Sequence, residues 1–266
     1  MEHLEGRQSV LAALSASQRR FHSILLRRGI HAESVAEIID LAAQRHVPVR
    51  YVEEGELAAH AHGTTHGGVI ALCGPKPRLD ANGLQELLDR TPGPPLLLLL
   101  EGIDDARNLG FAIRTAEAMG VTALLIKRHV WDFDAAEVAR PASGAYERLP
   151  LVQLADTAPL ARLSARGVRL IGCLANAKRT IHECDLCGPV LLVIGGEKRG
   201  VSGAVRSVCD AFATIPTVGG ASSLALSHAA AIVCAEALRQ RRARAALDAD
   251  AAGSSTSAAP PRTDSC

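Results

Sequence analysis

The sequence predicts an α/β protein with two domains, each built around a β-sheet. Short apolar runs typical of buried strands alternate with segments of helical periodicity along most of the 266 residues. From residue 96 onward the alternation repeats as strand–helix units, which favours a mostly parallel sheet covered by helices on both faces. Glycine-bearing loops follow the apolar runs. Because ligands of parallel sheets bind at the carboxyl ends of the strands, we expect these loops to surround one site.

Residues 1–75 are expected to form a small α/β domain. Its helical periodicity and apolar runs predict three helices and three strands; the helices are at 6–14, 32–45 and 54–61, and the strands at 21–26, 47–52 and 68–72. Residues 76–94 carry several prolines and glycines around one short amphipathic helix, so we predict a linker there.

Residues 95–244 are expected to form the second domain. The predicted strands are 96–100, 123–127, 168–174 and 190–194, and the predicted helices are 109–119, a stretch after 127, and 155–165, with a loop at 141–150. A last helix rich in small residues follows the glycine loop near residue 220 and ends near 240. Residues 245–266 are low-complexity Ala, Ser, Pro and Asp, which predicts a disordered tail.

The amino-acid composition limits how the protein could bind RNA and argues against contact with a membrane. Aromatic residues make up only 3% of the chain, so it is not expected to bind single-stranded RNA mainly by stacking bases. The net charge is +1, so a nucleic acid would have to be held by a local basic patch. No apolar run reaches membrane-spanning length, the N-terminus lacks a signal-peptide core, and the seven cysteines are odd in number. We expect a reduced, cytoplasmic protein without membrane contact.

Two groups of metal-binding residue types have unsuitable spacing. His60, His62 and His66 fit no regular ligand geometry, and His182, Cys184 and Cys187 lack a second Cys/His pair, so no metal is predicted. A basic run of arginines at 239, 241, 242 and 244 either contacts phosphate or solvates the end of the last helix. Neither a G-x-G-x-x-G turn after a strand nor a phosphate-loop motif is present, which disfavours NAD enzymes and P-loop NTPases.

Three ordered segments resemble the motifs of one known family. Residues 108–120 contain N-x-G-x-x-x-R followed by a small-residue helix, residues 192–200 read LVIGGEKRG, and residues 215–227 read IPTVGGASSLALS. Together they are similar to the SpoU (TrmH-type) RNA 2′-O-ribose methyltransferases of the SPOUT class. A small-residue loop at 142–150 also matches, and residues 1–75 resemble the accessory substrate-binding domain of that family.

The resemblance implies a parallel-sheet domain with a deep trefoil knot that binds S-adenosylmethionine, and a homodimer that binds RNA. Carried over by motif, Gly195, Ile215 and Leu224 are expected cofactor contacts, while Gly196 and Gly200 shape the loop. Glycine lets the backbone approach a ligand closely, which agrees with this assignment.

The resemblance also implies a catalytic set of Arg114, Asn108, Glu197 and Ser223. Arg114 is either a clamp on the phosphate that positions the ribose or a base assisted by that phosphate; a guanidinium is almost always protonated, so we favour the clamp. Asn108 is expected to orient Arg114 or the ribose, Glu197 to pair with Arg114 or organise its loop, and Ser223 to hydrogen-bond near the phosphate or cofactor. For Asn108 and Glu197, a helix cap and a solvated charge are the structural alternatives.

One departure from the family pattern concerns the third motif. The family usually has S-L-N-V-S there, whereas this chain has Ala225 in place of the asparagine. Two hypotheses follow: an enzyme that methylates a ribose 2′-hydroxyl in ribosomal RNA, which the accessory domain favours over transfer RNA, or a catalytically weakened RNA-binding protein.

Overall fold

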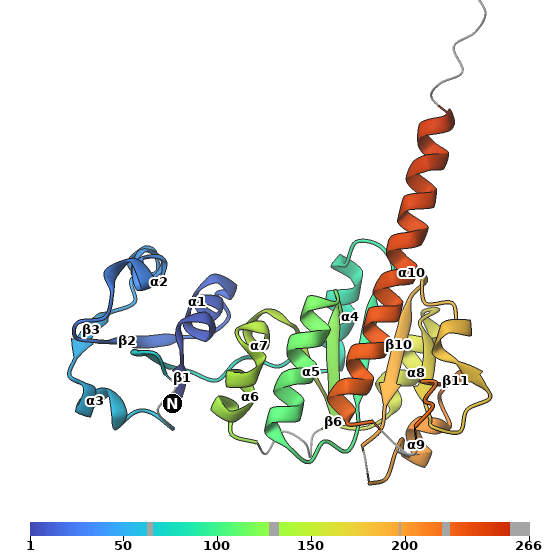
Figure 1. Ribbon diagram of the computed structural model, residues 1–266, viewed down its shortest axis with the longest axis horizontal. Helices are drawn as coiled ribbons and strands as arrows, with labels where there is room; N and C mark the ends of the chain where they lie inside the picture. The colour runs from blue at the N-terminus through green and yellow to red at the C-terminus, as the bar shows by residue number, and fades with distance from the viewer. Residues whose placement is uncertain (63–65, 128–132, 197, 220–223, 256–266) are drawn as a thin grey trace, which may run out of the picture.

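The computed structural model describes residues 1–62, 66–127, 133–196, 198–219 and 224–255, the last five of them by their backbone alone. It contains two sheets, one in the N-terminal part and one in the C-terminal part of the chain (Figure 1). The predicted α/β class and its division into a small N-terminal and a larger C-terminal part are confirmed. No helix in the described ranges is long and apolar enough to cross a membrane.

The N-terminal sheet has the strand order β1-β4-β2-β3. Its strands are β1 (Glu2–Glu5), β2 (Phe21–Arg27), β3 (Val49–Val52) and β4 (Val69–Cys73), and its helices are α1 (Arg7–Ala16), α2 (Ala32–Gln44) and α3 (Glu54–Ala58). Strand β1 was not predicted, because only one of its four residues, Leu4, is strongly apolar. Its pairing is antiparallel to β4, a long-range contact that local pattern does not reveal.

The C-terminal sheet has seven strands in the order β7-β6-β5-β10-β8-β11-β9, and each pairing is parallel. The strands are β5 (Leu96–Leu100), β6 (Ala123–Lys127), β7 (Leu151–Leu154), β8 (Arg169–Cys173), β9 (Arg179–Thr180), β10 (Val190–Ile194) and β11 (Ala211–Thr214). Strands β7, β9 and β11 were not predicted. Each has four residues or fewer, which is too short for a clear apolar run.

Helices cover both faces of this sheet, as the long apolar strands predict. They are α4 (Ala81–Arg90), α5 (Ala106–Ala118), α6 (Ala135–Ala142), α7 (Ala145–Arg148), α8 (Ala158–Ala165), α9 (Gly203–Arg206) and α10 (Leu226–Ser255), with a 3₁₀ turn at Ile181–Glu183. Alternate residues of the strands pack with α5, α6, α7 and α10 on one face and with α4, α8 and α9 on the other.

Two segments are more ordered than the sequence alone indicates. In the expected linker 76–94, Leu84 and Leu88 of the short helix α4 are buried in the core of the large sheet. The expected tail 245–266 is helical as far as Ser255, where α10 extends beyond the domain (Figure 1). Its many alanines are strong helix formers and continue a helix already nucleated on the core. Residues 256–266 lie outside the described part.

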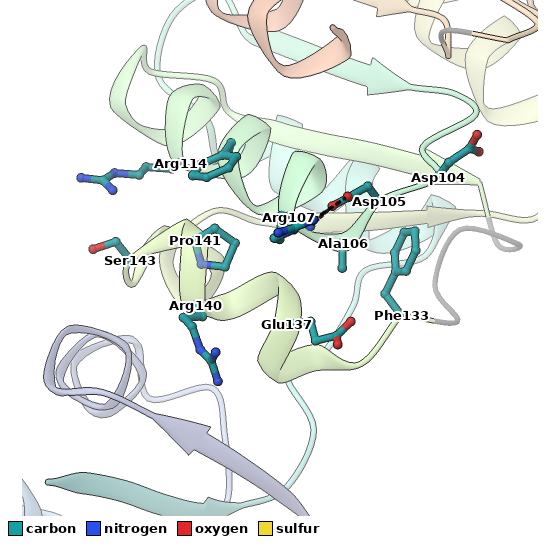
Figure 2. A pocket seen from close by; sticks show the side chains of 11 residues that line it. Asp104, Asp105, Ala106, Arg107, Arg114, Phe133, Glu137, Arg140, Pro141 and Ser143 are labelled. Atoms are coloured by element: carbon teal, nitrogen blue, oxygen red, sulfur yellow. Dashed lines mark hydrogen bonds and ion pairs between the residues drawn. The ribbon is translucent and has the colours of Figure 1, made fainter. Parts of the chain in front are cut away.

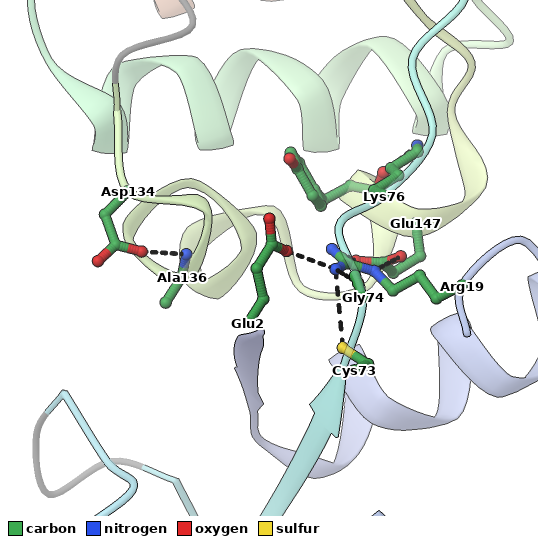
Figure 3. A network of polar contacts seen from close by, with 9 residues as sticks. Glu2, Arg19, Cys73, Gly74, Lys76, Asp134, Ala136 and Glu147 are labelled. Carbon is green, nitrogen blue, oxygen red and sulfur yellow. Dashed lines mark hydrogen bonds and ion pairs between the residues drawn. The ribbon is translucent and has the colours of Figure 1, made fainter. Parts of the chain in front are cut away.

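The two domains meet along a buried seam. Gly144 lies under α1, where a Cβ atom would stand 2.9 Å from the carbonyl oxygen of Gln8, and the expected loop at 141–150 contains the end of α6 and all of α7. Beside it, Arg19 donates two hydrogen bonds of 2.8 Å to Glu147 of α7, and both side chains are 1% exposed (Figure 3). Arg19 also pairs with Glu2. The seam therefore joins the domains by paired, desolvated charges.

A buried lysine continues the seam. The Lys76 ammonium donates to the carbonyl oxygens of Tyr146 and Leu149, and burial lowers the pKa of Lys76 to about 8. On the exposed side, Arg140 of α6 lies 3.1 Å from the carboxylate of Glu5, so charges of both domains pair along its length.

Candidate active site at the carboxyl edge of the large sheet

The loops after β5 and β10 contact each other through two glycines. A Cβ atom on Gly196 would lie 2.3 Å from the carbonyl oxygen of Gly102, and one on Gly195 would lie 2.1 Å from the backbone carbon of Gly200. A short bridge also pairs Gly196 with Gly200. Backbone packing against backbone thus requires glycine at 195 and 196, whatever these loops bind.

A buried carboxylate that sequence reasoning missed holds this edge together. Glu101 follows β5 directly, is 4% exposed, and forms an ion pair with Lys127 at the end of β6. It also accepts hydrogen bonds of 2.9 Å from the backbone and the hydroxyl of Ser202, which caps α9. A charged residue immediately after a five-leucine strand was the available signal, because such a residue must find partners when it is buried.

Helix α5 begins at the same edge and presents Asn108. The carboxylate of Asp105 caps the helix by accepting from the backbone amides of Arg107 (2.7 Å) and Asn108 (3.2 Å), and these hydrogen bonds lower the pKa of Asp105. The Asn108 side chain lies 3.4 Å from the hydroxyl of Ser227 at the start of α10. Ser227 thus joins the site, although only its place in the third motif had pointed to it.

Asn108 lines a small cavity of about 220 Å³ at the contact of these loops. The other lining residues are Gly102, Ile103, Asp104, Asp105, Lys198 and Leu226. The cavity therefore joins the loop after β5, the loop after β10 and the start of α10, which are three of the segments expected to surround one ligand.

Arg114 lines a second, larger cavity of about 720 Å³ between α5 and α6 (Figure 2). Arg114 lies six positions after Asn108, which places the two side chains about 120° apart around the helix axis. The hydrogen-bonding partner of Asn108 in this structure is Ser227, and the expected role of Asn108, which is to orient Arg114 or the ribose, stays a prediction. The two cavities adjoin, because Asp104 and Asp105 line both.

Two further expected cofactor contacts, Ile215 and Leu224, lie in the described part of the chain. Ile215 directly follows β11 and packs against the core, and Leu224 lies two residues before α10. Glu197 and Ser223 lie outside the described residues, so their roles stay predictions.

The His/Cys string at 182–187 has structural partners. His182 lies 3.4 Å from the carboxylate of Glu236, and the thiol of Cys184 donates to the carbonyl oxygen of Thr180. His62 contacts Glu5 and Asp134 in the same way. Within the described ranges, no three His, Cys, Asp or Glu side chains are grouped as metal ligands.

Comparison with known proteins matches both domains. Residues 95–235 match the SpoU rRNA Methylase family, and residues 3–79 match the family described as RNA 2′-O ribose methyltransferase substrate binding. The 23S rRNA (guanosine-2′-O-)-methyltransferase RlmB of Pseudomonas aeruginosa is 37% identical over 90% of this chain and 97% of its own. The protein of the same name from Vibrio vulnificus is 32% identical over 91% of this chain and 98% of its own.

A solved structure shows the same architecture. The SpoU methyltransferase AviRb from Streptomyces viridochromogenes, in complex with the cofactor AdoMet, superposes with a TM-score of 0.76 at 24% identity, covering 91% of this chain and 90% of that one. With both domains matched in order, the chain belongs to the SpoU family of RNA methyltransferases, with an N-terminal substrate-binding domain.

Proposed function

We propose that this protein transfers a methyl group from S-adenosylmethionine to the ribose 2′-hydroxyl of a guanosine in 23S ribosomal RNA. The observation that carries the proposal is the adjoining pair of cavities at the carboxyl edge of the sheet. One contains Asn108 beside the glycine loops, and the other contains Arg114. The choice of substrate is supported by the names of two relatives that match this chain over nearly their whole length.

The residues of the glycine loops fit the cofactor. S-adenosylmethionine supplies an electrophilic methyl group when it is bound. Gly195, Gly196 and Gly200 place backbone groups at the end of β10, and Ile215 and Leu224 offer half-buried apolar side chains for an adenine. AviRb, which has the same fold, was solved with AdoMet bound.

The chain's own polar groups then act on the RNA. Arg114 is exposed and has no hydrogen-bonding or ionic partner among the described residues, so its guanidinium is available to clamp a phosphate. The side-chain oxygen of Asn108 accepts from Ser227, which leaves the Asn108 amide free to donate to the ribose. In this arrangement Ser227 orients Asn108. The asparagine that the family has at position 225, where this chain has Ala225, is not needed for that contact.

The proposal retains four expectations from the sequence. They are a trefoil knot in the C-terminal domain, a homodimer, a cytoplasmic location, and the assigned roles of Glu197 and Ser223. The alternative, a protein that binds RNA without turnover, has less support, because the relatives named above are methyltransferases and Asn108, Arg114 and both glycine loops are retained.

The test is methyl transfer from radiolabelled S-adenosylmethionine to an unmodified 23S rRNA transcript, with cofactor binding measured in parallel by calorimetry. We expect label in the RNA from the wild type. Arg90→Ala, which changes an exposed arginine on the opposite face of the sheet, is the matched control and should transfer normally. Cofactor binding without label in the RNA would favour the binding-only alternative.

A further inference from the structure

Three residues of α5 form a stripe in the wall of the larger cavity. Arg107, Phe111 and Arg114 follow one another at intervals of four and three, so they share one face of the helix. Phe111 is 49% exposed. A single exposed apolar side chain needs no explanation by itself, so the case depends on what surrounds it.

The surroundings concentrate a residue type that is scarce in this chain. Of four phenylalanines in 266 residues, Phe111 and Phe133 both line this cavity. Its volume, about 720 Å³, lies within the usual range of roughly 300–1,000 Å³ for small-molecule sites. An exposed aromatic face in a hollow of this size suits a flat ring, and a base released from stacking presents one.

The charged residues of the cavity are paired except at two positions. Four of them have ionic partners: Arg107 and Asp105 pair with each other, Arg140 pairs with Glu5, and Asp104 pairs with Lys198. Arg114 and Glu137 are exposed, and neither has a partner among the described residues. Glu137 lies in the first turn of α6, where a carboxylate also complements the helix dipole.

The two available charges lie at different ends of the cavity. Figure 2 shows Arg114 beside Ser143 at one end, and Glu137 near Phe133 at the other. Phe111 is one helical turn from Arg114 and one from Arg107 on the same face of α5. The cavity thus offers a cation, an aromatic face one helical turn from it, and a carboxylate at the other end, and a nucleotide carries an anion, a flat base and an edge of N–H donors.

We infer that the base of the target nucleotide stacks on Phe111 while the Glu137 carboxylate accepts hydrogen bonds from its Watson–Crick edge. Guanine suits this carboxylate best, because its N1–H and N2–H₂ groups donate side by side, whereas adenine offers only its amino group on that edge. The inference rests on the proposed function for the placement of the ribose near Arg114. It adds two residues that determine base specificity.

Equilibrium binding tests the inference without turnover. The probes are two fluorescent pentanucleotides, 5′-UUGUU-3′ and 5′-UUAUU-3′, titrated at low ionic strength. We expect the wild type to prefer the guanine probe by roughly tenfold and Glu137→Gln to lose that preference. Glu33→Gln, which removes a first-turn glutamate from α2, is the matched control and should keep it. Equal wild-type affinities, or a preference that survives in Glu137→Gln, would overturn the assignment.

A second series isolates the aromatic ring. Phe111→Ala and Phe111→Leu should both weaken binding of the guanine probe by roughly 10- to 100-fold, and Phe111→Trp should restore it, with the melting temperature and cofactor affinity unchanged throughout. Equal binding by the leucine and wild-type proteins would show that only apolar bulk matters. Conversion of an oligomer to monomers by Phe111→Ala would place the ring against a second copy of the chain. Either result contradicts stacking.

The two proposals fail separately in these assays. A guanine preference that depends on Glu137, together with no methyl transfer to the 23S rRNA transcript, would reject the proposed function and keep the base site. Methyl transfer by a wild type that does not distinguish the probes would do the reverse.

Discussion

Arg19 and Arg114 use the same side chain in opposite surroundings. Arg19 lies in the seam between the domains, 1% exposed, and donates to Glu147, Glu2 and the carbonyl oxygen of Gly74. Arg114 is exposed in the large cavity and has no partner within the described ranges. One guanidinium has its hydrogen-bonding capacity satisfied by the fold, and the other leaves it available to a ligand.

The difference separates stability from activity. A buried charge that loses its partner keeps its desolvation cost, so changes at the seam should lower the stability of the fold. An exposed charge without a partner contributes little to folding, so changes at Arg114 should affect only the chemistry. The predictions that follow test this separation, beginning with the largest expected effect.

Arg114→Ala should lower methyl transfer by roughly 100- to 1,000-fold, the usual cost of removing a group that stabilises or positions the reacting centre. Cofactor affinity and the midpoint of urea unfolding should stay at wild-type values. Single-turnover assays with the 23S rRNA transcript measure the first effect. Wild-type turnover in the variant would remove Arg114 from the mechanism.

Glu147→Ala should destabilise the protein by about 3–5 kcal/mol, because it leaves Arg19 buried with one ionic partner, the half-buried Glu2. Urea unfolding followed by circular dichroism measures the change. The double variant Arg19→Met/Glu147→Ala should recover part of the loss, since it removes the orphaned charge. A loss of unfolding free energy below about 1 kcal/mol would mean that the Arg19–Glu147 pair stabilises the protein no more than an exposed ion pair does.

Lys76 should make stability depend on pH in the alkaline range. Its folded pKa of about 8 is below the ordinary value of 10.5, so between these values the unfolded chain binds a proton that the folded chain lacks, and stability rises with pH. Burial raises the pKa of Cys73 to about 11, which acts in the opposite direction. Comparing Lys76→Met with the wild type cancels that contribution.

We expect the unfolding free energy of Lys76→Met to rise less between pH 8 and 10.5 than that of the wild type. Identical slopes for the two proteins would mean that Lys76 keeps an ordinary pKa in the folded state.

The smallest effect is expected at an exposed pair. Arg90 and Glu86 on α4 form an i,i+4 ion pair 3.5 Å long, with both side chains more than two-thirds exposed. Arg90→Ala should change the unfolding free energy by less than about 0.5 kcal/mol. A cost comparable to that of Glu147→Ala would show that burial does not govern the energy of these arginines.

Local pattern predicted the elements that have long apolar runs, and it failed where long-range pairing decides the structure. Strand β5, five leucines, was evident from the sequence, whereas β1 and β11 are strands only because of the neighbours they pair with. The segment 76–94 shows the same limit. Its prolines and glycines indicated a domain boundary with a short helix, but they did not reveal that Leu84 and Leu88 of that helix pack into the core of the large sheet.

The motifs predicted which residues belong to the site. They did not predict the contacts that these residues make with one another. The motif resemblance located Arg114, Asn108 and the glycine loops. It did not reveal that Asn108 hydrogen-bonds Ser227, since that depends on how α10 packs against α5. Glu101 was missed because its partners are distant in the sequence: Lys127 ends strand β6, and Ser202 caps helix α9.

The central claim is tested most directly by identifying the methylated atom. The 23S rRNA transcript would be incubated with the protein and S-adenosylmethionine carrying a deuterated methyl group, digested to nucleosides and analysed by mass spectrometry. We predict the heavy methyl group on the ribose of guanosine, and its loss in Arg114→Ala. A heavy methyl group on a base, or an undiminished ribose signal in that variant, would contradict the account.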